Sequence, residues 1–185
     1  MNKLKSTLLY FLVISILILT TGCSSNKTDQ SNTNINTIYE LEQELEILKE
    51  ENDADKEVCI LSAYWHDVGR MYGKEGHGVN SAEMLKSELN KNNYNDEFIQ
   101  KCYKAICKHD TKEIPETLEG IIVKDADKID AVGIERWKAC VESNQRLPRI
   151  FPNLREEMII RESSKKMYDK NARKLIEYLS KIIKK

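Results

Sequence analysis

The chain has 185 residues, which is enough for one domain of moderate size preceded by an export leader. Its 29 basic and 30 acidic side chains leave a net charge of -1, and this balance argues against a protein dedicated to binding nucleic acid. Proline and glycine are scarce, at 3 and 7 residues, whereas lysine, glutamate, leucine and isoleucine are plentiful, so the composition favours an all-α fold.

The beginning of the chain has the pattern of a secretory leader. A positively charged start precedes an apolar run over residues 8–19, which is shorter than the roughly 20 residues of a membrane-spanning helix. The ending Gly22-Cys23 resembles a bacterial lipobox, in which the cysteine is lipidated and becomes the first residue of the mature chain. We therefore expect a signal peptide over residues 1–22 and a lipid anchor on Cys23, which would hold the protein at the extracytoplasmic face of the cell membrane. An ordinary secretory signal or an uncleaved anchor is the alternative.

A polar tether and an amphipathic helix follow the leader. Residues 23–36 are mostly Ser, Asn, Thr, Lys, Asp and Gln, and they have too little apolar surface to fold, so they predict a flexible linker. We expect the folded domain to span residues 37–185. Its first helix is predicted by an apolar stripe at three- and four-residue steps: Ile38, Leu41, Leu45 and Leu48.

Capping and helix-breaking residues divide the rest of the domain into further helices. The helices expected from these signals run from a cap at Asn52-Asp53 to near Gly69, from a capping pair at Asn80 and Glu83 to about Leu89, from Asn95 to Cys107, from Leu118 to about Val141 with a break near Gly133, and from Leu154 to Lys184. The segments between them contain the prolines and most of the glycines. No strand-like alternation and no internal repeat is present, so one helical bundle is predicted.

Four cysteines follow Cys23, at positions 59, 102, 107 and 140, and no two of them form a CxxC pair. Each lies in an apolar helical context, where a free cysteine behaves as a small hydrophobic residue. An exported location would permit disulfides, but the spacing assigns no pairs. We expect buried thiols.

Two clusters of polar residues in apolar surroundings are candidates for a metal site. His66-Asp67 ends the most apolar helix, where an imidazole and a carboxylate are costly unless they are paired or bind a metal. The alternative is a helix-terminal histidine beside a solvated aspartate. The second cluster lies between Ile121 and Val132, and its spacing places Asp127 and Asp130 on one helix face. Such a pair needs a cation or an arginine, unless it belongs to a solvated acidic stripe.

Four segments, taken in order, resemble the HD-domain metal-dependent phosphohydrolases. They cover roughly residues 55–137. The segment 62–70 contains a His-Asp signature followed by an aliphatic residue, glycine and a basic residue. The others are Gly76-His77 with Ser81-Ala82, the run 105–110, and the run 123–133, which is similar to the Asp-Ala-Asp block of small bacterial HD hydrolases.

The resemblance implies a helical bundle that holds a divalent metal ion, which would activate a water and polarise a phosphoryl oxygen. Mixed imidazole and carboxylate ligands leave the ion open among Mn, Fe, Co, Ni, Zn and Mg. In relatives with two metals, the positions of His77 and His109 hold the second ion or contact the phosphate. The predicted metal ligands are His66, Asp67 and Asp127, and the predicted catalytic residues are Asp67, His77, His109 and Asp130.

The expected substrate is a small phosphorylated molecule, in particular a nucleotide, and no binding of nucleic acid is expected.

The sequence departs from the family pattern at one expected metal ligand. The family's first ligand is a histidine on the first helix, whereas no histidine precedes His66 here and the nearest pattern match places Asn34 at that position. Three outcomes are open: a weaker metal site, a centre that relies on the second-metal residues, or a catalytically degenerate HD domain that binds metal, nucleotide or a partner.

Overall fold

The structure, a computed structural model, describes residues 41–110, 112–143 and 154–183, all within the unit Ile35–Lys185. The predicted leader, the lipidation site Cys23, the tether and Asn34 lie outside the described residues. Within the described ranges the regular structure is helical and contains no strand, which confirms the all-α prediction. None of the helices in these ranges has the length and apolar character needed to cross a membrane.

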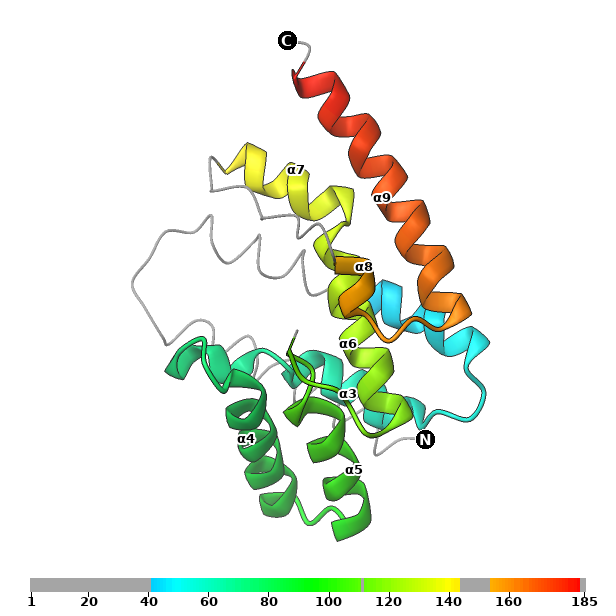
Figure 1. The fold of residues 1–185 in the computed structure, drawn as a ribbon. Coiled ribbons are helices and arrows are strands. Elements are labelled where there is room, and N and C mark those ends of the chain that lie inside the picture. Colours follow the sequence, from blue (N-terminus) through cyan, green and yellow to red (C-terminus); the bar gives the residue numbers. More distant parts are fainter. Residues whose placement is uncertain (1–40, 111, 144–153, 184–185) are drawn as a thin grey trace. The chain divides into compact units, whose positions relative to one another are not determined.

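Figure 1 shows the described elements in chain order. Residues 41–50 are helical. The elements after this first helix are α3 (Lys56–Trp65), the 3-10 helix η1 (Val68–Tyr72), α4 (His77–Lys91), α5 (Asp96–Cys107), α6 (Leu118–Ala131), α7 (Ile134–Glu142), α8 (Leu154–Glu157) and α9 (Glu162–Ile183).

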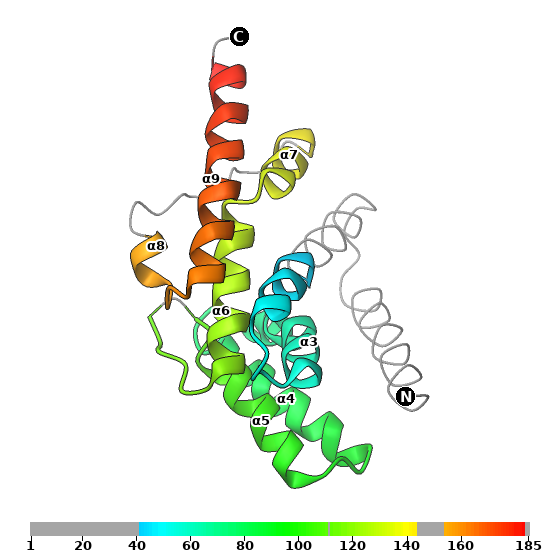
Figure 2. The same cartoon turned by 90° about the vertical axis from the view of Figure 1, so that its right-hand side faces the viewer.

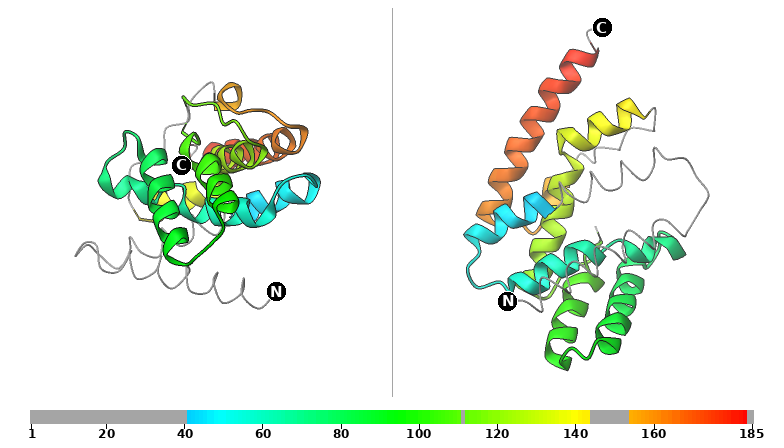
Figure 3. Two further views of the ribbon diagram at one scale, coloured as in Figure 1. Left: turned by 90° about the horizontal axis from the view of Figure 1, so that it is seen from below. Right: turned by 180° about the vertical axis from the view of Figure 1, so that it is seen from behind.

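Helix α6 is central to this arrangement. It packs against α3, α5 and α9, and α9 also contacts α7 (Figures 1 and 2). Helices α4 and α5 lie side by side as a hairpin, and α4 also packs against η1 (Figure 3). The ends of α3 and α5 and the start of α4 are thereby brought towards the face of α6 that carries the Asp-Ala-Asp segment.

One apolar core cluster joins the first helix to α3, α6 and α9. Its buried members are Ile47, Leu48, Ala54, Cys59, Ile122, Ala126, Ile129, Met158 and Met167. The stripe expected on the first helix is correct for Leu48 and wrong for Leu45, which is 45% exposed. The buried face of this helix instead includes Glu44 and Ile47, one position away from the predicted stripe.

The helix boundaries agree with the capping signals in part. Asn95 caps α5 through a hydrogen bond from the Phe98 amide, as predicted, and Gly133 separates α6 from α7. The cap expected at Asn52-Asp53 is wrong, because Asp55 caps α3. The tail is not one continuous helix either, since residues 158–161 interrupt it between α8 and α9.

Helix α4 begins at His77, three residues before the expected capping pair. Gly76 is its N-cap and has a φ of 66°, a left-handed conformation that favours glycine. No side chain caps this helix, so Asn80 lies inside α4 and not before it. The earlier start places His77, which is only 2% exposed, in the first turn beside the candidate site.

The four cysteines in the described part of the chain are free, as predicted. Cys59 and Cys102 are buried, whereas Cys107 and Cys140 are half-buried. Burial raises the pKa of the Cys59 thiol and raises that of Cys102 to about 12. Burial therefore keeps the thiols of these two core cysteines protonated at neutral pH.

An ion pair fastens the end of the first helix to the start of α9. Arg161 donates two hydrogen bonds to Glu51, at 2.5 Å from Nε to Oε1 and 2.6 Å from Nη2 to Oε2, and Ser163 Oγ donates a third at 3.2 Å. The hydrogen bonds from Arg161 hold the pKa of Glu51 below its usual value and outweigh the opposing effect of burial. This pair therefore stabilises the fold only while Glu51 is ionised.

The variant Glu51→Gln should lower the free energy of unfolding by about 1–2 kcal/mol near pH 7, because charge-assisted hydrogen bonds are lost. The folded pKa of Glu51 lies below the unfolded value of 4.5, so its contribution is present above that pH and disappears as the pH falls. Urea unfolding near pH 7 and near pH 3 should therefore show a gap between variant and wild type that closes in acid. Glu50→Gln, which loosens only a surface pair at 4.0 Å with Lys166, is the control. A gap of the same size at both pH values would contradict the assignment.

Candidate metal centre

The chain turns sharply at the His-Asp signature. Helix α3 ends at Trp65, His66 is its C-cap, and η1 begins at Val68. The two adjacent side chains can face one space because the helix stops there, as expected from the sequence. The amide of Gly69 donates a hydrogen bond to Ser81 Oγ at 2.8 Å, which ties this turn to α4.

Two glycines set the spacing between the elements of the site. A Cβ on Gly69 would lie 2.4 Å from the carbonyl oxygen of His77 and 2.6 Å from the amide nitrogen of Ser81. A Cβ on Gly78 would lie 3.2 Å from Nδ1 of His109. Side chains at these positions would push η1 away from α4, and α4 away from the end of α5.

The variant Gly69→Ala should destabilise the protein by about 2–3 kcal/mol, because the added methyl group meets backbone atoms that cannot move independently. Ser81→Ala removes the hydrogen bond from the Gly69 amide without adding an atom, and it should cost only about 1 kcal/mol. Urea unfolding of both variants compares the two effects. If Gly69→Ala costs no more than Ser81→Ala, the close approach of η1 to α4 is not what requires glycine.

Three histidines present the same ring nitrogen to a common space. In each ring Nδ1 donates to the carbonyl oxygen of the residue three positions earlier, and a carbonyl oxygen can only accept. A neutral ring held in this way carries its lone pair on Nε2, which is the usual arrangement of a metal-binding histidine. The three pairs are His66 with Ala63 at 2.7 Å, His77 with Lys74 at 2.8 Å, and His109 with Ile106 at 2.8 Å.

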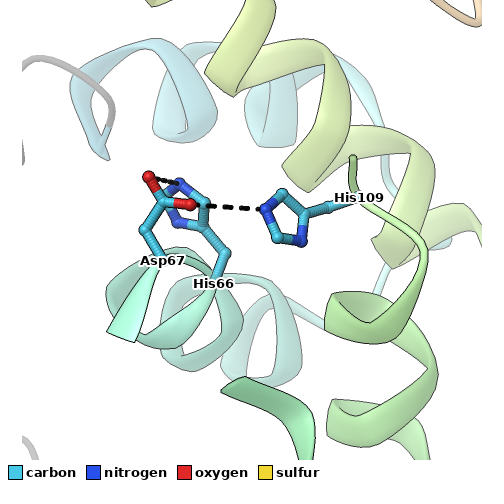
Figure 4. A group of neighbouring side chains, drawn as sticks. All are labelled: His66, Asp67 and His109. Atoms are coloured by element: carbon cyan, nitrogen blue, oxygen red, sulfur yellow. Dashed lines mark ion pairs between the residues drawn. The ribbon is translucent and has the colours of Figure 1, made fainter. Parts of the chain in front are cut away.

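The three Nε2 atoms converge on the carboxylate of Asp67. His77 Nε2 lies 3.2 Å from Oδ1, His109 Nε2 lies 3.5 Å from Oδ1, and His66 Nε2 lies 3.6 Å from Oδ2. The Nε2 atoms of His77 and His109 are 3.1 Å apart. Figure 4 shows His66 and Asp67, at the end of α3, facing His109 across this space.

These distances fit the ligand shell of a single ion. Two nitrogen lone pairs 3.1 Å apart repel each other unless a proton or a cation lies between them. Ligand bonds of about 2.1 Å separate neighbouring ligand atoms by about 3.0 Å in an octahedral shell and about 3.4 Å in a tetrahedral one. His66, Asp67 and His109 can also offer three ligand atoms within 4.8 Å of one another. The donor set therefore fits a divalent metal.

Asp67 is ionised in this setting. Burial would raise the pKa of its carboxyl group, but the neighbouring His109 and His66 and the guanidinium of Arg70 outweigh that effect and hold the pKa well below its usual range. Arg70 Nε lies 2.6 Å from Oδ1 of Asp67. The carboxylate is thus available as a charged oxygen ligand across the neutral pH range.

The two acidic residues predicted on α6 are buried close by. Asp127 is 9% exposed and Asp130 is 1% exposed, so a solvated acidic stripe is excluded. Burial and the charge of Asp67 raise the pKa of Asp127, whereas the charges of Lys128 and His66 lower it, and the net shift is downward. Oδ2 of Asp127 accepts a hydrogen bond from Lys128 Nζ at 2.5 Å. It lies outside the group whose ligand atoms are within 4.8 Å, and His109 stands in that group beside the two predicted ligands. The role of Asp127 as a ligand stays a prediction.

Asp130 is held by an arginine of α7. Its Oδ2 accepts a hydrogen bond from Arg136 Nη1 at 2.7 Å. Burial raises the pKa of Asp130 to about 6, and the charge of Arg136 offsets the rise only in part. Asp125, two positions before Asp127, has a different setting: burial also raises its pKa to about 6, and Ser164 of α9 is its side-chain neighbour. The Asp-Ala-Asp segment therefore divides its carboxylates between the centre and the contact with α9.

A cavity of about 460 Å³ reaches Asp130. It is lined by the first helix, the start of α7 and the middle of α9. Its charged residues are both basic (Lys49, Arg136, Lys170 and Lys174) and acidic (Glu42, Glu46, Asp130 and Glu135). Its volume lies within the range of small-molecule sites. The cavity was not predicted from the sequence, because its lining comes from helices that are far apart in the chain and share no sequence motif.

Comparisons with known proteins agree with this geometry. A family model described as the HD domain matches residues 38–132, just over half of the chain. The fold is similar to the crystal structure of a predicted HD superfamily hydrolase from an uncultured Thermotogales bacterium. That match has a TM-score of 0.62 and 25% identity and covers 80% of this chain and 78% of the other. The search of curated proteins gave no match. Because the family model matches more than half of the chain, and because the histidine and aspartate residues of the site lie within the matched range, the chain belongs to the HD domain family.

Proposed function

We propose that this protein is a divalent-metal-dependent hydrolase of phosphate esters whose substrate is a small phosphorylated molecule, in particular a nucleotide. The observation that carries the proposal is the convergence of three histidine Nε2 atoms on the Asp67 carboxylate at 3.2 to 3.6 Å. Membership of the HD domain family supports it, as does the similarity to a Thermotogales protein described as a predicted hydrolase.

The metal would be held by Asp67, His77 and His109, with His66 and Asp127 as the further predicted ligands. When bound, it would lower the pKa of a coordinated water and polarise a phosphoryl oxygen. The backbone carbonyls that accept from each Nδ1 fix the ring orientations, so the site is organised before an ion enters. A set rich in imidazole suits Mn, Fe, Co, Ni or Zn better than Mg, which prefers oxygen ligands.

Asp130 is the best-placed carboxylate for the role of general base. A carboxyl group with a pKa of about 6 can accept a proton and return it near neutral pH. The hydrogen bond from Arg136 fixes its orientation, and the cavity described above is lined in part by Asp130.

Hydrolysis is tested with the full chain, depleted of metal and then reloaded with each candidate ion. A panel of phosphate monoesters and diesters that includes nucleotides should show turnover only in the loaded protein. Metal bound without turnover of any ester would contradict the hydrolase proposal and favour a degenerate domain that binds ligands. That alternative draws on the missing histidine before His66 and on the engagement of Asp127 by Lys128.

We further propose that the protein is anchored by lipid on Cys23 at the extracytoplasmic face of the cell membrane, as the Gly22-Cys23 ending suggests. The wild-type protein should partition into the detergent phase, and its N-terminal peptide should have the mass of a lipidated cysteine. Cys23→Ala should stay unprocessed or be released in another form. An unlipidated N-terminus in the wild-type protein would contradict the proposal.

A further inference from the structure

Three carboxylates at or beside the centre, those of Asp67, Asp127 and Asp130, each have a basic partner. Arg70 Nε lies 2.6 Å from Oδ1 of Asp67, Lys128 Nζ lies 2.5 Å from Oδ2 of Asp127, and Arg136 Nη1 lies 2.7 Å from Oδ2 of Asp130. The charges of Asp127 and Arg136 also affect the pKa of Arg70, so members of all three pairs lie near one another. Each of these three carboxylates therefore faces a positive charge of the chain itself.

The pairing of Lys128 with Asp127 is unusual for neighbours on a helix. Adjacent helical residues point about 100° apart and do not normally face each other. Lys128 is nevertheless buried, and its long side chain bends back so that Nζ meets the carboxylate. An unpaired buried carboxylate is costly, so Asp127 needs a cation, and Lys128 supplies one.

Arg70 contacts the oxygen that an ion would use. Oδ1 of Asp67 is the atom approached by Nε2 of His77 and of His109, and Arg70 Nε is closer to it than either of them. The Arg70 side chain is 49% exposed, so it can withdraw into solvent when another cation takes its place. The metal and Arg70 therefore compete for one carboxylate oxygen.

We propose that Arg70 and Lys128 are resident cations that hold the ligand carboxylates in the metal-free protein and are displaced when a divalent ion binds. Metal loading is then an exchange of cations and not a simple addition. This inference rests on the metal centre proposed above, but it does not depend on hydrolysis or on the substrate. Arg136 remains in place, because its partner Asp130 is not among the predicted ligands.

Exchange predicts effects of opposite sign on metal affinity and on stability. Arg70→Gln and Lys128→Met each remove a competitor, so each should tighten the binding of Mn²⁺ or Zn²⁺ by about tenfold. The same variants leave a carboxylate without its cation, so the metal-free proteins should melt at a lower temperature than the wild type. A purely structural role would lower the melting temperature without tightening metal binding.

Two controls separate displacement from a general effect of charge. Arg136→Met removes one positive charge from the same neighbourhood, but from the side chain that pairs with Asp130, and it should tighten binding by less than about threefold. Lys108→Met breaks a surface pair with Glu116 whose length is also 2.5 Å, and it should leave metal affinity unchanged.

The experiment is calorimetric titration of the metal-depleted full chain with Mn²⁺ and with Zn²⁺, together with melting curves before and after loading. Exchange is supported if Arg70→Gln and Lys128→Met both tighten binding more than Arg136→Met does. Unchanged or weaker affinity in these variants overturns it, and so does equal tightening by Arg136→Met. If Lys128→Met does not fold, the half-exposed position of Arg70 decides the question alone. A wild-type protein that binds no ion would instead remove the metal centre itself, and the exchange with it.

Discussion

The variant Asp67→Asn should bind no divalent ion at concentrations that saturate the wild-type protein, and its metal-dependent hydrolysis should fall by at least about a thousandfold. Asp67 is the residue on which the site converges, because all three histidines and Arg70 approach its two carboxylate oxygens. An amide keeps the shape of the side chain but removes the negative charge, and amide oxygen is a weak ligand for transition metals.

Metal content after dialysis and the rate of ester hydrolysis check this result together. Asp96→Asn is a suitable control, because it makes the same chemical change at an exposed position in the first turn of α5. The control should keep the wild-type metal content and rate. An Asp67→Asn protein that still binds one ion with wild-type affinity would show that Asp67 is not a ligand.

The variant His109→Ala should weaken metal binding by at least about a hundredfold, since loss of even an outer-shell partner of a metal site commonly costs ten- to a hundredfold. His109 Nε2 lies 3.1 Å from that of His77 and 3.5 Å from Oδ1 of Asp67, so its removal opens one side of the ligand shell. Titration with Mn²⁺ or Zn²⁺ measures the effect, and a melting curve confirms that the variant folds.

Asp127→Asn, studied in parallel, separates the two ligand sets. The sequence resemblance predicts that Asp127 is a ligand, whereas the structure places His109 in the group with His66 and Asp67. If both variants lose metal, both His109 and Asp127 contribute to binding the ion, and Lys128 has to give way. If His109→Ala keeps wild-type affinity while Asp127→Asn loses it, the histidine cluster is not the metal shell.

Much of the helical framework is predictable from local signals. The cap at Asn95 and the break at Gly133 are correct, because a capping side chain and a helix-breaking glycine act within a few residues. The start of α4 is not predictable in the same way. It depends on Gly76 in a left-handed conformation with no capping side chain, and Asn80 offers a competing signal that the fold does not use.

In the candidate site, too, some features can be predicted from local sequence and others cannot. The His66-Asp67 pair and the buried acidic segment on α6 stand out because charged groups in apolar helices need partners. Which partner each one meets is decided by tertiary contacts. The pairing of Asp127 with Lys128 and the fully buried Glu44 on the first helix have no periodic signature. The convergence of His77 and His109 requires that η1, α4 and α5 pack closely at Gly69 and Gly78.

The central claim is that one divalent ion binds among Asp67, His77 and His109. Diffraction from crystals of the full chain loaded with Mn²⁺ or Zn²⁺ tests it most directly, through the anomalous scattering of the metal. We expect an anomalous peak at about 2.1 Å from Oδ1 of Asp67 and from Nε2 of both histidines. A saturated crystal with no peak at these three atoms, or with its ion bound elsewhere, would contradict it.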